Sequence, residues 1–333
     1  MIIILTHHSD QTVNEVISWL YVKGASFYRI NIEDFLNKET TFTLLRNGKK
    51  KIYLSEKNSS YGIKLLKNNK EAVFWFRKWS RPAVLNEHYK TDSLEYQIGQ
   101  FVEDQIEDYQ KIFFSSFKKS KWLNSINVIN LKKLDLLSKA AGVGLNTPRT
   151  IVTTSKSELI KFKKKAEKII TKTIGDTQFF YNKKKTYGLY TSLINESDIE
   201  NIPDFFVPTL FQEYIEKKYE IRVFMLEEKF YSMAIFSQNS DKTKIDFREY
   251  DEEIPNRNVP YLLPSYIEKL LLIFSKKIGL NSGSFDLIKT IHGNYVFLEV
   301  NPVGQFGMVS YPCNYFLEEK IANYLLKLTA NNG

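Results

Sequence analysis

The chain has 333 residues, of which 43% are hydrophobic and 14% aromatic, and this composition is typical of a folded protein with about two domains. No apolar run approaches the ~18 residues of a membrane span, and the opening MIIILTHHSD has too short an apolar stretch for a signal peptide. The single cysteine, Cys313, excludes an intrachain disulfide. Together these features predict a cytoplasmic protein that is not bound to a membrane.

The formal net charge is +9, and much of it comes from two lysine-rich stretches, KFKKKAEK at 161–168 and NKKKTYG at 182–188. Basic clusters attract polyanions such as nucleic acids, nucleotide phosphates and acidic peptides. The first stretch has helical spacing and predicts a solvated surface, whereas the second contains glycine and polar residues that suit a mobile loop. Because no zinc spacing, helix-turn-helix or RNA-binding motif accompanies the charge, we do not expect a nucleic-acid partner.

The first third of the chain predicts an α/β domain. It opens with a strand, IIIL, followed by a helix to about Lys23 and a second strand, SFYRINI. A hairpin is expected around Gly48, then a strand in AVFWFRKWSRP that Pro82 ends, and a helix over 92–117 with apolar residues at helical spacing. We place the end of this N-terminal domain at residue 120.

The rest of the chain alternates helices with strands. The expected elements are, in order, a helix over 130–141, strands near 150 and 170, the strands TLFQEYI, YEIRVFML and KFYSMAIF, a helix over 264–278, a hairpin over 282–302 and a helix over 313–328. We divide this part into a central subdomain, 121–185, and a C-terminal subdomain, 186–333.

The hairpin SGSFDLIKTIHGNYVFLEVNP, at 282–302, carries polar residues where a sheet could use more apolar ones. A two-residue loop ending at Gly293 places Asp286 opposite Glu299, and a loop shifted by one residue places Asp286 opposite Asn301. Both registers put the three side chains on one face, whereas a three-residue loop would break this parity. The opposite face is expected to pack on a core and gathers Phe285, Leu287, Val296, Leu298 and Val300.

Two facing carboxylates with Cβ atoms ~5 Å apart repel each other unless a cation lies between them or one is protonated. A small set of carboxylate and amide oxygens suits Mg²⁺, which takes its other ligands from water and phosphates. The hairpin therefore predicts a magnesium site that serves a nucleotide. The alternative is a solvated face whose acids pair with nearby lysines.

From residue 121 to about 328 the chain resembles the ATP-grasp ligases. In that family a nucleotide lies between two antiparallel sheets, and ATP converts a carboxylate to an acyl phosphate that an amine or hydroxyl attacks. The segments that carry the resemblance are KKLDLLSKAAGVGLNTPRT, KIITKTIGD, FQEYIEKKYEIRV and the pair SFDLI and FLEVNP. The resemblance implies an α/β (α+β) chain with an ATP-grasp fold behind an N-terminal α/β domain, and ATP and Mg²⁺ as cofactors.

The resemblance also implies roles for single residues. The metal ligands would be Asp286, Glu299 and Asn301, and the two lysines at the ATP phosphates would be Lys133 and Lys172. Lys132 competes with Lys133 for the first of these positions.

The segment FQEYIEKKYEIRV would hold the rest of the nucleotide. By resemblance, Glu213 and the backbone of Tyr214 and Ile215 lie at the adenine, and Glu220 lies at the ribose.

Arg222 stands out because it alternates with apolar residues in a strand that should be buried, and a buried arginine needs an anion. By resemblance, Arg222 and Arg248 would clamp the γ-phosphate and the acyl phosphate, where fixed cations stabilise developing negative charge. The alternative for Arg222 is a buried ion pair with Glu213 or Glu220.

Within the family, the chain is most similar to the peptide maturases that make graspetides (microviridin-type peptides), especially the grasp-with-spasm branch. NTPRTIVTTS, NSGSFDLI and FLEVNPVGQFGMVS carry this similarity, together with FWFRKWSRP in the first domain. Such enzymes join Asp or Glu side chains of a ribosomal precursor peptide to Thr or Ser hydroxyls or Lys amines, giving ω-ester or ω-amide macrocycles. The implied partner is a precursor peptide with a leader and a core, and dimers among relatives make a homodimer an open option.

Three alternatives remain at this level. The first is an ATP-grasp ligase that adds a free amino acid to a peptide or protein, which would use the same nucleotide residues. The second is a nucleotide-binding protein without catalysis, and the third is a basic RNA-binding protein. The presence of all the metal ligands, lysines and arginines disfavours a nucleotide-binding protein without catalysis. An RNA-binding protein would leave the carboxylate hairpin unexplained.

The strand FWFRKWSRP suggests how an acidic peptide could be gripped. Strand alternation puts Trp75, Arg77 and Trp79 on one face, and Arg81 follows just before the chain turns. Indole rings can hold a guanidinium by cation–π contact and leave its donors free for a carboxylate. The alternative is an aromatic core strand with Arg77 covering its edge.

Overall fold

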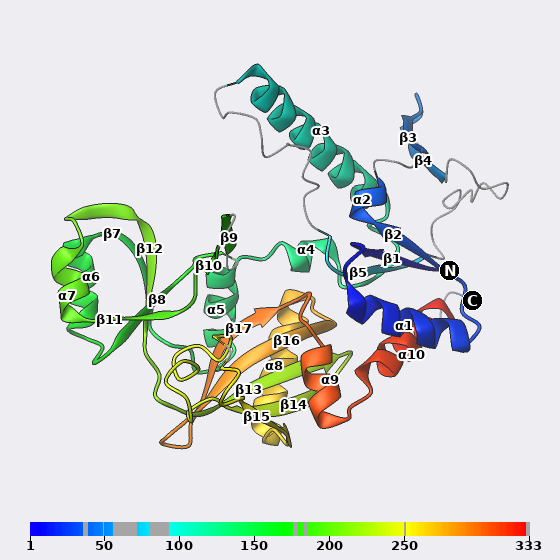
Figure 1. Ribbon diagram of the computed structural model, residues 1–333. Coiled ribbons are helices and arrows are strands. Elements are labelled where there is room, and N and C mark those ends of the chain that lie inside the picture. The colour runs from blue at the N-terminus through cyan, green and yellow to red at the C-terminus, as the bar shows by residue number, and fades with distance from the viewer. Residues whose placement is uncertain are drawn as a thin grey trace. The chain divides into compact units, whose positions relative to one another are not determined.

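The computed structural model describes residues 1–35, 39–48, 50–55, 72–79, 93–175, 179–182, 185–249 and 251–330. These form two compact units, Met1–Ile129 with Phe316–Gly333, and Asn130–Tyr315 (Figure 1). None of the described helices is both long and apolar enough to span a membrane.

The first unit is an α/β domain, as expected. Its elements are β1 (Ile2–Thr6), α1 (Gln11–Val22), β2 (Phe27–Asn31), α2 (Ile32–Phe35), β3 (Glu39–Leu44), β4 (Lys50–Ser55), β5 (Val73–Phe76), α3 (Leu94–Ser116), β6 (Lys121–Leu123), α4 (Ile126–Ile129) and α10 (Leu317–Ala330). Four strands form a parallel sheet in the order β2-β1-β5-β6, and β3 and β4 form the hairpin predicted around Gly48. The run IIIL is wholly buried in β1 because an inner strand of a parallel sheet is covered on both faces.

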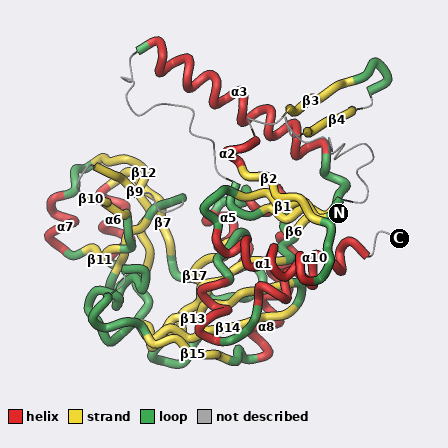
Figure 2. The backbone as a smooth tube through the Cα atoms, turned by 45° about the vertical axis from the view of Figure 1, so that its right-hand side comes forward, coloured by secondary structure: helices red, strands yellow, loops and turns green. Residues whose placement is uncertain are grey.

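Helices cover this sheet through apolar side chains. Phe113, near the C-terminal end of α3, packs with Ile3, Leu5 and Phe74. At the other end of α3, the Ser93 hydroxyl caps the helix by accepting a hydrogen bond from the Tyr96 amide at 3.1 Å. Helices α1 and α10 lie side by side (Figure 2). The predicted helix over 92–117 is therefore confirmed as α3.

The division of the chain differs from the predicted one at both ends. The first unit extends to residue 129 because β6, which follows the predicted boundary at 120, pairs with β5. Helix α10 belongs to the first unit rather than to the C-terminal subdomain 186–333, because it packs against α1 and the first sheet. The Lys23 ammonium on α1 lies 2.9 Å from the Glu319 carboxylate on α10.

The second unit contains the remaining elements. They are α5 (Lys133–Ala141), β7 (Thr150–Ser155), α6 (Lys156–Lys163), β8 (Ile169–Lys172), β9 (Phe179–Asn182), β10 (Lys185–Gly188), β11 (Ser192–Ile194), α7 (Glu196–Asn201), β12 (Phe205–Glu213), β13 (Lys217–Leu226), β14 (Lys229–Phe236), β15 (Arg257–Tyr261), α8 (Ser265–Ile278), β16 (Ser282–Thr290), β17 (Tyr295–Asn301) and α9 (Gly307–Cys313).

Two antiparallel sheets dominate this unit, which confirms the expected architecture. One has the strand order β11-β8-β12-β7 and the other has the order β15-β14-β13-β16-β17. The predicted subdomain boundary at 185 falls within the first of these sheets, whose strands run from Thr150 to Glu213.

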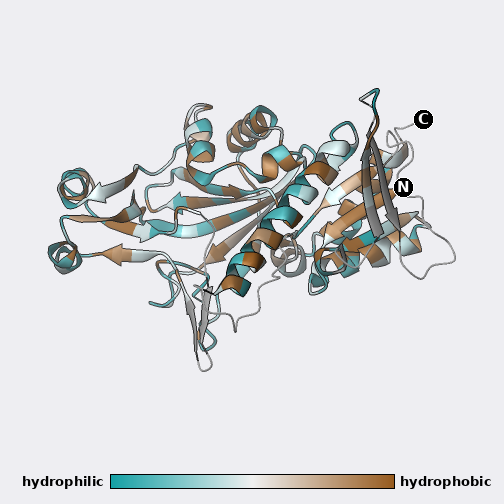
Figure 3. Ribbon diagram, turned by 90° about the horizontal axis from the view of Figure 1, so that it is seen from above, coloured by the Kyte–Doolittle hydropathy of each residue, from teal (hydrophilic) through white to brown (hydrophobic). Residues whose placement is uncertain are grey.

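The helices carry both hydrophobic and hydrophilic residues, as the hydropathy colours indicate (Figure 3). Helix α8 buries Ile267, Leu271 and Phe274, and Gly279 ends it with φ 74°, a conformation that glycine adopts without steric cost. The helix predicted over 313–328 is confirmed as α10, except that it begins at Leu317, because residues 314–316 separate it from α9. The helix starts late because Asn314 and Phe316 both have positive φ, which an α-helix excludes.

Candidate functional site

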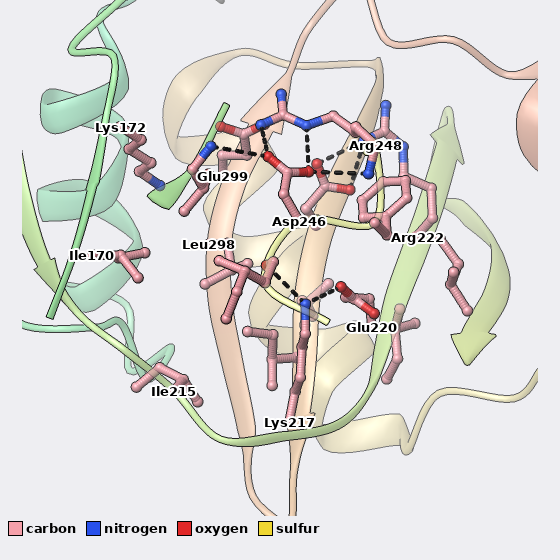
Figure 4. Close-up of a pocket in the computed structure, with 18 of the residues that line it drawn as sticks. Ile170, Lys172, Ile215, Lys217, Glu220, Arg222, Asp246, Arg248, Leu298 and Glu299 are labelled. Carbon is pink, nitrogen blue, oxygen red and sulfur yellow. Dashed lines mark hydrogen bonds and ion pairs between the residues drawn. The ribbon is translucent and has the colours of Figure 1, made fainter. Parts of the chain in front are cut away.

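A cavity of about 530 Å³ lies in the second unit and is lined by residues of both antiparallel sheets and of the segment after β14 (Figure 4). This volume is within the range of ~300–1,000 Å³ that is common for small-molecule sites. Ile170, Ile215 and Leu298 give one part an apolar lining, while charged side chains gather in another part. A cavity of this kind suits a ligand with an apolar group at one end and charge at the other.

The hairpin that carries the predicted metal ligands closes with three residues rather than two. The Thr290 amide donates to the Asn294 carbonyl at 2.9 Å, so residues 291–293 form the loop. Gly293 has φ 82° there, which explains the glycine. The expectation of a two-residue loop was therefore wrong.

The pairing of Asp286 with Glu299 is nevertheless confirmed, because the strand register shifts between Asp286 and Leu287. This irregularity is a β-bulge that restores the parity lost in the loop. It also turns Leu298 towards the cavity, so that Phe297 replaces it on the core face opposite Leu287. The predicted core position of Leu298 is thus corrected.

Each of the two facing carboxylates lies near a cation. Both Asp286 oxygens are 2.6 Å from one nitrogen of Arg222, which occupies the facing position on β13. The Glu299 carboxylate lies 3.5 Å from the Lys133 ammonium. These cations allow two acids to lie opposite each other inside a cavity.

The same environment separates the pKa values of the two acids. Burial raises the pKa of Asp286 to about 6, although Arg222 acts in the opposite direction. Burial also acts to raise the pKa of Glu299, but Lys133 and Lys172 more than offset it and hold that pKa below its usual value. As the pH rises, Glu299 therefore loses its proton before Asp286 does.

Lys172 ends β8 and lines the cavity near Glu299. Burial lowers its pKa, a shift that Glu299 opposes and that Lys133 reinforces. Among the described residues, no hydrogen-bond or ion-pair partner is found for the Lys172 ammonium. A half-buried cation without a partner is costly, so this position suits an anionic ligand.

Arg248 lies in the segment between β14 and β15, and its neighbour Asp246 holds it. The Asp246 carboxylate is 2.8 Å from Arg248 Nε and also accepts the Thr191 amide at 3.3 Å. The hydrogen bond with Asp246 raises the pKa of Arg248 further above neutrality, and Arg248 keeps the pKa of buried Asp246 low. Sequence reasoning named Arg248 but missed Asp246, although the Asp-x-Arg spacing offered a signal.

The segment predicted to hold the adenine lines the cavity with Glu213, Tyr214 and Ile215. The Glu213 carboxylate accepts from Arg149 Nε at 2.8 Å, and the Tyr214 amide donates to the Lys168 carbonyl at 3.0 Å. In the described part of the chain, no acceptor is found for the Ile215 amide. That amide is therefore available to a ligand.

Glu220, predicted at the ribose, also lines the cavity but has protein partners of its own. Its carboxylate accepts from Lys217 and from the Ser237 hydroxyl, and all three side chains are buried. Sequence reasoning missed Lys217 because strict alternation puts positions 217 and 220 on opposite faces. A register shift between Lys217 and Tyr219 brings the two side chains together.

Arg77 is the one predicted site residue whose surroundings oppose its predicted role. It is 3% exposed and lies 3.7 Å from the Asp10 carboxylate, so its donors are not presented to a peptide. Trp79 packs against Phe114 rather than beside Trp75, because β5 ends at Phe76. These surroundings fit the packing alternative, and the peptide-gripping role of Arg77 stays a prediction.

Arg81 lies outside the described residues. Of the loop expected over 182–188, Lys183 and Lys184 also lie outside them, but the expectation is wrong for Lys185–Gly188, which form strand β10 paired with β9. Arg81 stays a prediction.

The hairpin residues fit the predicted divalent cation in chemistry. Asp286, Glu299 and Asn301 supply two carboxylates and an amide, all lining the cavity. Within the described ranges no group of three or more His, Cys, Asp and Glu side chains is arranged to hold a metal, so any metal here would need ligands from outside the protein. That requirement matches the preference of Mg²⁺ for water and phosphate ligands.

Comparison with known proteins was made at three levels. No protein-family model matches the chain, and no curated protein matches it. Solved structures do match over nearly the whole length. The macrocyclase MdnC from Microcystis aeruginosa MRC, bound with precursor peptide MdnA, has 26% identity and a TM-score of 0.81, covering 98% of this chain and 99% of that chain.

Two further structures give the same result. A RiPP-associated ATP-grasp ligase from Chryseobacterium gregarium, in complex with ADP and a leader and core peptide, has 23% identity and a TM-score of 0.78, covering 100% of this chain and 97% of that chain. The ATP-grasp ligase PsnB, complexed with minimal precursor, Mg and ADP, has 16% identity and a TM-score of 0.74, covering 98% and 97%. Together with the two antiparallel sheets, these similarities show that the chain has the fold of the ATP-grasp ligases, and over nearly its whole length it is similar to the macrocyclase MdnC.

Proposed function

We propose that this protein is an ATP-dependent macrocyclase of a ribosomal precursor peptide. It would activate Asp or Glu side chains of the peptide and join them to Thr or Ser hydroxyls or Lys amines, giving ω-ester or ω-amide rings. The observation that carries the proposal is the arrangement of four cations, Lys133, Lys172, Arg222 and Arg248, around the facing carboxylates of Asp286 and Glu299. The neighbours bound to ADP, Mg and precursor peptides support it.

Bound ATP and Mg²⁺ would supply the phosphoryl group that turns a peptide carboxylate into an acyl phosphate. The protein's own part is to hold charge in fixed positions, which stabilises a polyanion without reorganisation during the reaction. Asp286, Glu299 and Asn301 would hold Mg²⁺, and Lys133 and Lys172 would hold the phosphates.

The apolar part of the cavity would take the base of the nucleotide. Ile170, Ile215 and Leu298 offer flat apolar contact there, and the Ile215 amide offers a donor. Glu213 and Tyr214 would complete the adenine contacts, and Glu220 would lie towards the ribose. Arg222 and Arg248 would meet the γ-phosphate and the acyl phosphate.

The test is mass spectrometry of a candidate precursor after incubation with the protein, ATP and Mg²⁺. A short peptide rich in Thr, Asp, Glu and Lys, encoded beside this protein, is the probe. Each ring should remove the mass of one water, because each new ester or amide bond is a condensation. A mass gain equal to an added amino acid would instead favour the free-amino-acid ligase, and unchanged peptide without ADP formation would favour a non-catalytic nucleotide-binding protein.

Two finer points belong to the same proposal. A cytoplasmic location is favoured by the single cysteine and by a substrate made on ribosomes. A homodimer is proposed from the resemblance alone, and light scattering on the purified protein tests it.

A further inference from the structure

Lys217 is buried beneath the cavity and makes two contacts that link separate parts of the second unit. Its ammonium pairs with the Glu220 carboxylate and donates to the Ile245 carbonyl at 3.0 Å (Figure 4). Its side chain is 4% exposed, so both contacts are shielded from water. We infer that Lys217 is a positioning residue that fixes the segment carrying Asp246 and Arg248 to the floor of the cavity.

The electrostatics explain why the contact is rigid. Burial raises the pKa of Glu220, and Lys217 opposes this shift and favours the ionised form. A buried ammonium must satisfy its donors, and the Ile245 carbonyl is an acceptor within reach. Moving that carbonyl would leave a buried cation with one partner fewer, so the segment is held in place.

The contact lies directly beside the residues that hold Arg248. Asp246 follows Ile245, and its carboxylate accepts both the Arg248 side chain and the Arg248 amide, the latter at 3.1 Å. The position of Arg248 thus depends on Asp246, and the position of Asp246 depends on its neighbour Ile245. Lys217 acts on Arg248 through this chain of contacts without touching it.

A second part of the same loop is held independently of Lys217. The Asp251 carboxylate accepts the amides of Glu253 and Ile254 at 3.1 and 3.3 Å and the Ser240 hydroxyl at 2.5 Å. None of these contacts involves Lys217 or Glu220. Residues 251–254 therefore provide an internal control for any change that is specific to residues 244–249.

The experiment is hydrogen–deuterium exchange on the whole chain without ligand, comparing wild type with Lys217→Met. Methionine keeps most of the side-chain volume and removes the ammonium. The reporting amides are those of Lys244, Arg248 and Glu249, which bond to Ser240, to the Asp246 carboxylate and to the Asp246 carbonyl. We expect them to exchange on the order of tenfold faster, because a hydrogen bond from a charged donor slows local opening by about that factor or more.

The matched control is Lys218→Met, which changes the same residue type one position along on an exposed side chain. It should leave exchange unchanged over the whole loop. Equal protection of residues 244–249 in Lys217→Met and Lys218→Met would overturn the inference. So would a uniform rise that includes residues 251–254, because it would show general destabilisation instead of a lost local contact.

A second variant covers the case in which Lys217→Met alone does not fold, since Glu220 would then be a buried charge without its cation. Lys217→Met combined with Glu220→Gln removes both charges. We expect this double variant to recover a melting temperature close to wild type while residues 244–249 stay fast in exchange. Recovery of wild-type protection in the double variant would contradict a role for the Lys217 ammonium in holding the loop.

The catalytic consequence rests on the proposed function, whereas the exchange result does not. If Lys217 works through Arg248, Lys217→Met should lower kcat, and this loss should disappear in an Arg248→Ala background. If Lys217→Met lowers kcat by the same factor in the wild-type and the Arg248→Ala backgrounds, coupling through Arg248 is refuted. If no peptide is modified by wild type, the proposed function fails and the exchange measurement still decides the inference.

Discussion

Arg222 and Asp286 lie opposite each other on neighbouring antiparallel strands, and one guanidinium nitrogen is 2.6 Å from both carboxylate oxygens. The pair resolves why an arginine alternates with buried apolar residues in β13. Its partner is the predicted metal ligand, not Glu213 or Glu220. Arg222 therefore contacts one acid of the facing pair and also lines the cavity, where it is placed to respond to a bound anion.

The carboxylate pair should be needed for turnover but not for folding. We expect Asp286→Ala and Glu299→Ala each to lower peptide-dependent ATP turnover at least ~100-fold, and Asn301→Ala to lower it as well, because each removes an oxygen ligand of Mg²⁺. Steady-state ADP release at limiting Mg²⁺ measures this. The exposed carboxylate variant Glu252→Ala is the control. Near wild-type turnover in Asp286→Ala or Glu299→Ala would refute the metal site.

Magnesium-dependent nucleotide affinity should fall in mild acid. Burial raises the pKa of Asp286 to about 6, so this carboxylate takes up a proton as the pH falls through 6, and a protonated carboxyl binds Mg²⁺ poorly. Calorimetry of ADP binding from pH 7.5 to 5 should show the added dependence only with Mg²⁺ present. The Asp286→Asn variant lacks the titrating carboxyl and therefore shows how far the titration of ADP alone changes the affinity. Equal pH profiles in wild type and Asp286→Asn would count against Asp286 as the titrating Mg²⁺ ligand.

Lys172→Met should weaken nucleotide binding about tenfold or more, because it removes a cavity cation for which the described residues supply no partner. Lys133→Met should have a smaller effect, since Lys133 also faces Glu299. ADP affinity by calorimetry is the measurement, and the exposed Lys164→Met, outside the cavity lining, is the control. Unchanged affinity in Lys172→Met would mean that β8 does not face the phosphates.

Arg77→Ala should act on stability, not on peptide binding. Buried Asp10 would lose its nearest cation, which costs about 3 kcal/mol and lowers the melting temperature by at least about 5 °C. Lys78→Ala, at a more exposed partner of Asp10, should change it by less than about 2 °C. A raised KM for the precursor at an unchanged melting temperature in Arg77→Ala would restore the peptide-gripping role. The KM of Arg81→Ala for the precursor tests whether Arg81 contributes to peptide binding.

Gly304→Ala should damage the metal hairpin. A Cβ at Gly304 would lie 2.2 Å from the Ser284 hydroxyl and 2.7 Å from the Ser284 amide nitrogen, and Ser284 pairs with Asn301. The backbone must move, so we expect a loss of about 2 kcal/mol or more and weaker Mg²⁺-dependent ADP binding. At Gly175 a Cβ meets no described atom within 4 Å, so Gly175→Ala should leave both measurements unchanged.

Much of the second unit could be predicted from the sequence because its signals are local. Alternation of polar and apolar residues gave the faces of β13 and most of β16, and the order of four separated motifs gave the family. The types of the charged residues in the cavity followed from the same motifs. The exceptions within the strands are Lys217 and Leu298, and both lie at register shifts.

The sequence by itself predicted most of the longer strands and helices and most of the charged residues that line the cavity, because side-chain periodicity and residue chemistry are properties of short segments. Only the tertiary structure decided how those residues pair. Arg222 meets Asp286 across 64 positions, and the two bulges that turn Lys217 and Leu298 towards the cavity depend on hydrogen bonding between strands. A register shift of one residue reverses the face of a side chain, and no local pattern records it.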